Sequence, residues 1–288
     1  MHDVSIVVAT KNRNEQLNTM LASLIPAIQD VDYEVIAIVG EPKNKTLEVL
    51  DKYRVKNIHI ESECMGHGNH SWGQLYNFGF RKSDAKWIMY CSDDITFNEG
   101  CFRNAINELD KQPDTVAGGS FFYRTFPSDP IFDIYGVDYT YGHKLMVNYG
   151  LIRKDAFWEV GGLEETYYKF YCADGDLCFK LYDIGKTNIL LPKCLVTHRK
   201  GIDSTAKMHF SGSNNDIANY EKRWQKYLKI YAGLNPRRVW LRDLERLERI
   251  KNGTQIEDND SRRFIKMEKQ IAFGLAAGDA PDIKEIWL

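Results

Sequence analysis

The sequence lacks a long hydrophobic run, a secretory leader and an excess of positive charge. The apolar stretches Val4–Ala9 and Trp87–Cys91 are far shorter than the ~18 residues of a membrane-spanning helix. The N-terminus has no basic and apolar regions of a signal peptide. We therefore expect a cytoplasmic protein, either soluble or peripheral at the inner face of the membrane. The 38 basic residues do not outnumber the 40 acidic ones, which argues against a nucleic-acid partner.

Paired cysteines and a glycine-rich phosphate loop are also missing. The six cysteines form no Cys-x-x-Cys pair, so they predict reduced core thiols rather than a zinc site or a disulfide framework. The segment from Thr10 to Leu17 contains no glycine, which argues against a nucleotidyltransferase. The two histidines of Gly66–His70 have no third ligand nearby, so we interpret this segment as a mobile loop for donor or acceptor.

Short apolar runs alternate with helical repeats in the first hundred residues. The pattern predicts strands at Val4–Ala9, Glu34–Val39, Asn57–Ile60 and Lys86–Cys91. It predicts a first helix in which Leu17, Leu21 and Leu24 recur until Pro26 stops the repeat. Two more helices are predicted, from about Lys43 to Tyr53 and from about Ser71 to Lys82. This alternation indicates a doubly wound α/β sheet with right-handed crossovers. We expect residues 1–97 and 98–210 to form two halves of one domain, and residues 211–288 to form a helical extension.

Polar loops follow three of the predicted strands. They are Thr10–Arg13, Gly40–Pro42 and Ser92–Asp94. In sheets of this class, ligands bind beyond the carboxyl ends of the strands, so the three loops are expected to converge on one crevice. Asp93 and Asp94 repel each other unless a cation lies beside them. An isolated Asp-Asp pair is more often a solvated turn, but this position at the end of an apolar strand favours a cation site.

Further acidic residues and a histidine stand out in the second half. Asp174 and Asp176 begin a predicted helix that ends at Gly185. Taken alone, they are more simply explained as caps that interact with the helix dipole. His198 follows the predicted strand Leu190–Thr197, and a lone histidine is more often structural than a ligand.

In order along the chain, these segments resemble the inverting family-2 glycosyltransferases of GT-A fold over roughly residues 3 to 225. The first strand with its polar loop looks like the family's nucleotide loop, and Asn77-Phe78-Gly79 is similar to its Asn-x-Gly. Ser92-Asp93-Asp94 stands where the Asp-x-Asp metal motif lies. Gly161–Glu165 and Asp174–Leu177 are similar to two segments of the family's acceptor half.

Three positions depart from the family pattern. Ser92 replaces the first acidic residue of the metal motif, and Ala173 replaces the Glu before the presumed base. Glu41 stands where an Asp often contacts the nucleobase. The residue that corresponds to the base itself, Asp174, is present.

The resemblance implies a Rossmann-like, mostly parallel twisted sheet flanked by helices. It implies transfer of one sugar, with inversion, from a nucleotide-diphosphate sugar to a hydroxyl of a glycan or lipid-linked acceptor. Asp174 would be the catalytic base, Asp94 and His198 would bind Mn²⁺ or Mg²⁺, and Gly162 and Asp176 would bind the acceptor. The residues implied in donor binding are Thr10, Asn12, Arg13, Glu41, Asn77, Ser92 and Asp93. The alternative is a catalytically inactive GT-A domain that binds nucleotide or glycan.

The C-terminal third adds three expectations. Tyr220–Trp224 keeps only the Arg-Trp of the processive-synthase signature, which favours a non-processive enzyme. Arg199–Asn215 is rich in Gly, Ser and Asn and predicts a lid over the donor. Arg237–Lys251 predicts an amphipathic helix that packs on the catalytic domain or on a second copy in a homodimer. The alternative is a peripheral contact of this helix with an anionic membrane.

Overall fold

The computed structural model describes residues 1–40, 44–60, 70–126, 135–140, 144–199, 215–230 and 237–240. The first part of the chain forms β1 (His2–Lys11), α1 (Asn14–Ile28), β2 (Tyr33–Gly40), α2 (Asn44–Lys52), β3 (Lys56–Ile60), α3 (Trp72–Lys82) and β4 (Ala85–Ser92). The second part forms β5 (Ile95–Phe97), α4 (Cys101–Leu109), β6 (Val116–Phe126), β7 (Gly136–Tyr139), β8 (Gly150–Arg153), α5 (Lys154–Glu159), α6 (Ala173–Asp183), β9 (Thr187–Arg199), α8 (Gln225–Ile230) and β10 (Arg237–Trp240).

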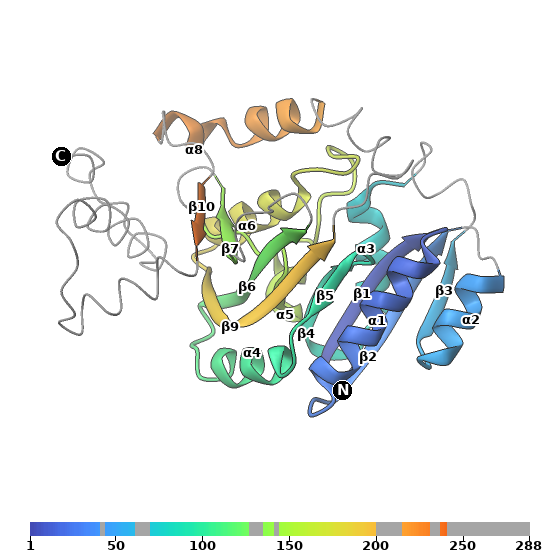
Figure 1. Cartoon of the computed structure of the whole chain (residues 1–288). Helices are drawn as coiled ribbons and strands as arrows, with labels where there is room; N and C mark the ends of the chain where they lie inside the picture. Colours follow the sequence, from blue (N-terminus) through green and yellow to red (C-terminus); the bar gives the residue numbers. More distant parts are fainter. Residues whose placement is uncertain are drawn as a thin grey trace.

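One mixed sheet runs through both halves (Figure 1). Its order is β10-β7-β6-β8-β4-β1-β2-β3, with β9 paired to both β5 and β6. The four strands β3, β2, β1 and β4 are parallel, as the alternating sequence pattern predicted. Beyond β4 the pairing becomes mainly antiparallel, because β8, β6, β7 and β10 each run opposite to their neighbour. The α/β fold is therefore confirmed, with a parallel half that is joined to a mixed half.

Helices cover both faces of the sheet. On one face, Val4, Ile6 and Val8 of β1 pack in a core cluster with the apolar side of α1 and with α4. On the other face, Val7 belongs to a second cluster with α3, α5 and α6. Successive residues of a strand point to opposite faces, so β1 contributes to both clusters, and the strand is buried on both sides.

The helix α1 does not stop at Pro26, contrary to the sequence prediction. It continues to Ile28 with Pro26 inside its last turn. A proline costs a helix one hydrogen bond and a steric contact with the preceding turn. Here Leu24, Ala27 and Ile28 are all buried in the core, and this burial offsets the cost.

The prediction of a wholly helical C-terminal part is correct for residues 215–230, apart from a turn at residue 224, and wrong at residues 237–240. Arg237–Trp240, expected to begin a helix, is the edge strand β10, antiparallel to β7. A single β-branched residue and a tryptophan in this stretch suit either state, and pairing with the open edge of β7 decides for strand. The rest of that predicted helix, and with it the homodimer and membrane contacts assigned to it, lies outside the described residues.

Other predictions also fall wholly or partly outside the described residues. Residues 200–214 of the predicted lid lie outside them, as do Glu41 and residues 61–69 around the paired histidines. The division at residues 97 and 210 stays a prediction. In the described residues, no helix is long and apolar enough to cross a bilayer. The five described cysteines carry free thiols, four of them buried, as predicted for core residues.

Candidate functional site

The parallel strands β1 and β4 bring two of the predicted polar loops together. Their register pairs Ala9 with Ser92, so Thr10 and Asp93 lie side by side at the carboxyl ends of the strands. The Thr10 hydroxyl donates to Asp93 Oδ2 at 2.7 Å. Asp93 is only 2% exposed, so its carboxylate is available to neighbouring protein groups more than to a ligand.

Arg13 returns to the same strand ends and binds both carboxylates. It follows Asn12, whose φ of 54° lies in the left-handed region that asparagine tolerates better than most residues. One guanidinium nitrogen of Arg13 donates to Asp93 Oδ1, and Nη2 donates to Asp94 Oδ2 at 2.9 Å. The repulsion between the two aspartates, which favoured a metal in the sequence, is thus relieved by an arginine of the chain itself.

His198 reaches Asp94 through the antiparallel pairing of β5 with β9. The register pairs Ile95 with His198, and the Arg199 amide donates to the Asp94 carbonyl at 2.7 Å. His198 Nε2 lies 3.5 Å from Asp94 Oδ1, which also accepts a hydrogen bond from the Ser92 hydroxyl. The two residues implied as metal ligands are therefore neighbours.

The charge state of Asp94 follows from these contacts. Burial by itself raises the pKa of the Asp94 carboxyl. The hydrogen bond and charge of His198, the Ser92 hydroxyl and the Arg13 guanidinium outweigh this effect and hold the pKa well below its usual range. Asp94 is consequently an anion at neutral pH.

Asp174 lies in the first turn of α6, which belongs to the mixed half of the fold rather than to the parallel half formed by β1 to β4. Its Oδ1 accepts a hydrogen bond from the Gly175 amide at 2.9 Å. Burial raises the pKa of the Asp174 carboxyl, the Gly175 amide opposes that rise, and the negative charge of Asp138 adds to it. The sequence argument stressed the helix dipole, whereas in the structure desolvation is the larger effect.

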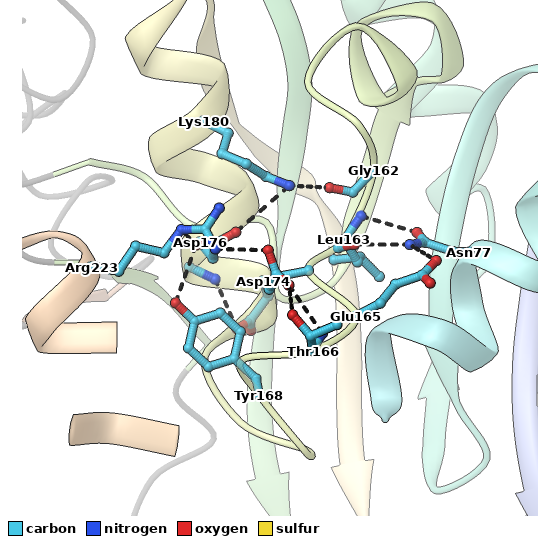
Figure 2. A network of polar contacts seen from close by, with 12 residues as sticks. Asn77, Gly162, Leu163, Glu165, Thr166, Tyr168, Asp174, Asp176, Lys180 and Arg223 are labelled. Atoms are coloured by element: carbon cyan, nitrogen blue, oxygen red, sulfur yellow. Dashed lines mark hydrogen bonds and ion pairs between the residues drawn. The ribbon is translucent and has the colours of Figure 1, made fainter. Parts of the chain in front are cut away.

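Three predicted site residues turn out to be parts of a buried network rather than of an open surface (Figure 2). Asn77 is 1% exposed, and its amide group donates to the Leu163 carbonyl and to Glu165 Oε1, each at 2.8 Å. The Leu163 amide donates back to Asn77 Oδ1. Gly162 is buried beside it, since a Cβ there would lie 2.8 Å from Asn77 Oδ1. In the structure Asn77 and Gly162 therefore hold this loop, and their assigned contacts with donor and acceptor stay predictions.

Asp176 is also buried in this network. It is 0% exposed, and its Oδ1 accepts hydrogen bonds from Trp224 Nε1 at 2.8 Å and Tyr168 Oη at 3.2 Å. Arg223 Nε lies 3.0 Å from the same oxygen, and Lys180 Nζ lies 3.7 Å from Oδ2 (Figure 2). This carboxylate is fully buried, and its assigned contact with the acceptor stays a prediction. It stabilises the segment that carries Asp174.

Sequence reasoning missed a second anchor for the same segment. Asp216, 2% exposed, accepts hydrogen bonds from the backbone amides of residues 169, 170 and 171 at 2.8–2.9 Å. It belongs to the helical residues 215–223, which also carry Arg223. The Arg-Trp pair was noticed only as a fragment of a processive signature, and the structure gives it a structural role. No local pattern marks Asp216, because its partners are distant in sequence.

The donor atoms at the strand ends suit a divalent cation only in part. Asp94 and His198 supply one carboxylate and one imidazole, while Arg13 and Ser92 already bind both oxygens of Asp94. In the part of the chain that the structure describes, no three His, Cys, Asp or Glu side chains are arranged so that they could hold a metal ion together. Mg²⁺ and similar hard cations are commonly held by one or two side chains, with substrate phosphates and water completing the coordination. The site fits a cation that arrives with the donor.

Several solved structures share this fold at low sequence identity. The mannosyltransferase PcManGT from Pyrobaculum calidifontis, solved with GDP-Man and Mn²⁺, has a TM-score of 0.57 at 12% identity, over 78% of this chain and 64% of that one. TarS from S. aureus, solved with UDP-GlcNAc, has a TM-score of 0.53 at 16% identity, over 75% and 66%. GalNAc-T7, solved with UDP, GalNAc and Mn²⁺, has a TM-score of 0.57 at 12% identity, over 96% and 56%. The chain thus spans just under two thirds of the length of PcManGT.

The sequence comparisons give one family. A search of curated proteins finds no match. Residues 5–162, more than half of the chain, match the family model described as glycosyl transferase family 2. This range contains the Arg13, Asp93 and Asp94 cluster and ends at Gly162, before Asp174 and His198. With its GT-A fold and its acidic strand ends, the chain belongs to glycosyl transferase family 2.

Proposed function

We propose that the protein transfers one sugar per event from a nucleotide-diphosphate sugar to a hydroxyl of a glycan or lipid-linked acceptor, with inversion and with a divalent cation. The proposal rests on one observation above all. The β5–β9 pairing places His198 against Asp94 at the strand ends of a family-2 domain, beside Arg13. The ligands of the similar structures, GDP-Man, UDP-GlcNAc and Mn²⁺, support a nucleotide-sugar donor.

The donor's diphosphate would lie at the Arg13, Asp94 and His198 cluster. The Arg13 guanidinium is partly buried, with 14% of its side chain exposed, and it can donate to phosphate oxygens in planar geometry. Asp94 and His198 would hold the cation. When bound, that cation offsets the negative charge that develops on the leaving diphosphate. The hydrogen bonds that Asp93 accepts from Thr10 and Arg13 hold the cluster in position.

Asp174 would accept the proton of the attacking hydroxyl. The pKa of its carboxyl is raised, chiefly by burial, which makes it a better base than an exposed aspartate once it is ionised. The bond with the Gly175 amide fixes the orientation of the carboxylate. The buried Asp176 and Asp216 hold the backbone on both sides of this turn. A base on the face opposite to the leaving group is what inversion requires.

Two features of the proposal come from the sequence alone. Transfer of a single sugar follows from the incomplete processive signature at Tyr220–Trp224. A cytoplasmic location and a peripheral membrane contact stay predictions.

The first experiment is isothermal titration calorimetry with UDP, GDP and CDP, each with and without Mn²⁺. We expect one nucleotide to bind, and to bind more tightly with the cation. Asp110→Asn serves as a control, because Asp110 pairs with Lys86 on the surface, away from the strand ends. If no nucleotide binds under either condition, the proposed function is wrong.

One observation favours the inactive alternative, namely that Arg13 and Ser92 already bind both oxygens of Asp94. An inactive domain would bind the nucleotide and leave the nucleotide sugar intact. The discriminating assay is slow hydrolysis of the matching nucleotide sugar, followed by NMR. Asp174→Asn should abolish any hydrolysis, and the anomeric configuration of the released sugar reports inversion directly.

A further inference from the structure

A row of side chains leads from the Asp94–His198 pair into the mixed half of the sheet. The ring of His198 lies 6.2 Å from the ring of Tyr149, and Tyr149 lies 5.0 Å from Tyr123 in an edge-to-face arrangement. The Tyr123 hydroxyl donates to Asp138 Oδ2. These residues come from β9, the residue before β8, β6 and β7, so the mixed strand pairing assembles the row.

The carboxylate at the end of the row has a fixed orientation. Asn148 Nδ2 donates to Asp138 Oδ2 at 2.8 Å, beside the bond from Tyr123. Asn148 Oδ1 is buried and accepts no hydrogen bond from the described residues. Turning the amide over would point this oxygen at the carboxylate, so the observed orientation is the one that Asp138 requires. Asp138 itself is half-buried, unlike its neighbours Val137 and Tyr139, which are buried.

The row also lies between the two ends of the proposed reaction. The charge of Asp138 acts on Asp174, where it adds to the rise in pKa caused by burial. Tyr149 is affected by Asp94 from one side and by Asp138 from the other, since both add to the rise in its pKa caused by burial. In an inverting transfer the donor's sugar lies between the leaving diphosphate and the base. The row is thus close enough to both Asp94 and Asp174 for their charges to be felt along it.

The chemistry of the row suits a sugar. A half-buried carboxylate accepts strong, charge-assisted hydrogen bonds from hydroxyl groups, and it repels phosphate. Tyrosine rings present an apolar face to the C–H groups of a pyranose and a polar edge to its oxygens. We propose that Tyr149, Tyr123 and Asp138 form the subsite for the donor's sugar, with Asp138 as a specificity-determining residue that accepts hydrogen bonds from its hydroxyls. This inference rests on the proposed function.

The test compares the affinity for a nucleotide sugar with the affinity for its nucleoside diphosphate. Calorimetry with Mn²⁺ would use UDP-glucose, UDP-GlcNAc and GDP-mannose against UDP and GDP. Asp138→Asn keeps the size of the side chain and removes its charge. We expect it to weaken binding of the matching nucleotide sugar by about tenfold or more, the worth of one charge-assisted hydrogen bond. Affinity for the nucleoside diphosphate should stay within about twofold, which also shows that the variant is folded.

Two further variants sharpen the result. Tyr123→Phe keeps the ring and loses the bond to Asp138, so it should weaken only nucleotide-sugar binding, by less than Asp138→Asn does. Asp110→Asn, which neutralises a surface aspartate, should change neither affinity. Equal affinities of the wild-type protein for the sugar and the diphosphate, or a difference that Asp138→Asn leaves intact, would overturn the inference. Failure of the wild-type protein to bind any of these nucleotides would instead refute the proposed function.

Discussion

Arg223→Met tests whether the network beneath the predicted base has the energetic weight that its burial implies. Arg223 Nε lies 3.0 Å from Asp176 Oδ1, and Nη1 donates to Glu164 Oε2 at 2.7 Å. Methionine keeps most of the aliphatic stem and removes the guanidinium. Asp176, 0% exposed, would then be a buried carboxylate that has lost its nearest cation (Figure 2).

The expected loss of unfolding free energy depends on the contacts that Asp176 keeps in the variant. Removing one partner of a buried ion pair costs about 3–5 kcal/mol of unfolding free energy. Arg223 is 29% exposed, and Asp176 keeps the bonds from Trp224 and Tyr168, so we expect the lower end, about 3 kcal/mol. For a chain of this size each kcal/mol corresponds to about 2–4 °C, so Tm should fall by roughly 6–12 °C. Arg81→Met is the matched control, since Arg81 is 54% exposed and pairs with Glu165 at 2.8 Å. Exposed pairs contribute about 0–1 kcal/mol.

The loss should also depend on pH. Burial raises the pKa of Asp176, while Lys180 and Arg223 oppose that rise, so the variant's Asp176 has a higher pKa still. A protonated Asp176 does not need the guanidinium, and the difference in unfolding free energy is therefore full at pH above the raised pKa and shrinks as pH falls through it. Glu164, whose pKa is lowered to about 2 with the help of Arg223, acts in the same direction. Urea denaturation at several pH values across this range measures the difference in unfolding free energy between the variant and the wild-type protein. A pH-independent loss, or one no larger than that of Arg81→Met, would refute the reasoning.

The remaining predictions concern the two ends of the site and the second anchor. Asp174→Asn should leave nucleotide affinity unchanged and lower the transfer rate by roughly 10²–10⁴, with the acidic limb of the wild-type rate profile lying above the usual pKa of an aspartate, because burial raises that of Asp174. Transfer at the wild-type rate would place the base elsewhere. Asp94→Ala should abolish the Mn²⁺-dependent part of nucleotide binding in calorimetry, and unchanged metal dependence would exclude Asp94 as a ligand. Asp216→Ala removes the acceptor of three backbone amides and should lower the unfolding free energy by about 2–4 kcal/mol in urea. A change no larger than that of Asp114→Ala, which alters an exposed residue, would contradict the anchoring role.

Much of the local structure could be predicted because it depends on neighbouring residues. The apolar runs of β1, β2 and β4 appear as strands within a few residues of their predicted bounds. Ser71 and Gln74 form a capping box at the start of α3. Gly185, with φ of 80°, follows the end of α6 as its position in the pattern indicated. In each case the signal and the conformation lie within one turn or one strand.

The sequence also predicted the positions of the polar residues at the strand ends, but it did not predict their contacts. The sequence alone determined that Thr10, Arg13, Asp93 and Asp94 follow apolar strands, and parallel pairing then brings them together. It could not determine that Arg13, rather than a metal, relieves the repulsion of the aspartates, since that depends on the path of the loop after Asn12.

Only the tertiary structure decided which predicted residues meet at the strand ends and which are buried in a network. His198 meets Asp94 through the register of β5 and β9, and Asp138 lies near Asp174 because β7 joins the mixed half of the sheet. Asn77 and Asp176 match family motifs, yet both are buried in the network that holds the loop before α6. A sequence pattern specifies the backbone conformation and the apolar faces of each element. The residues that meet across the sheet depend on strand register and on the packing of distant segments, which no local pattern contains.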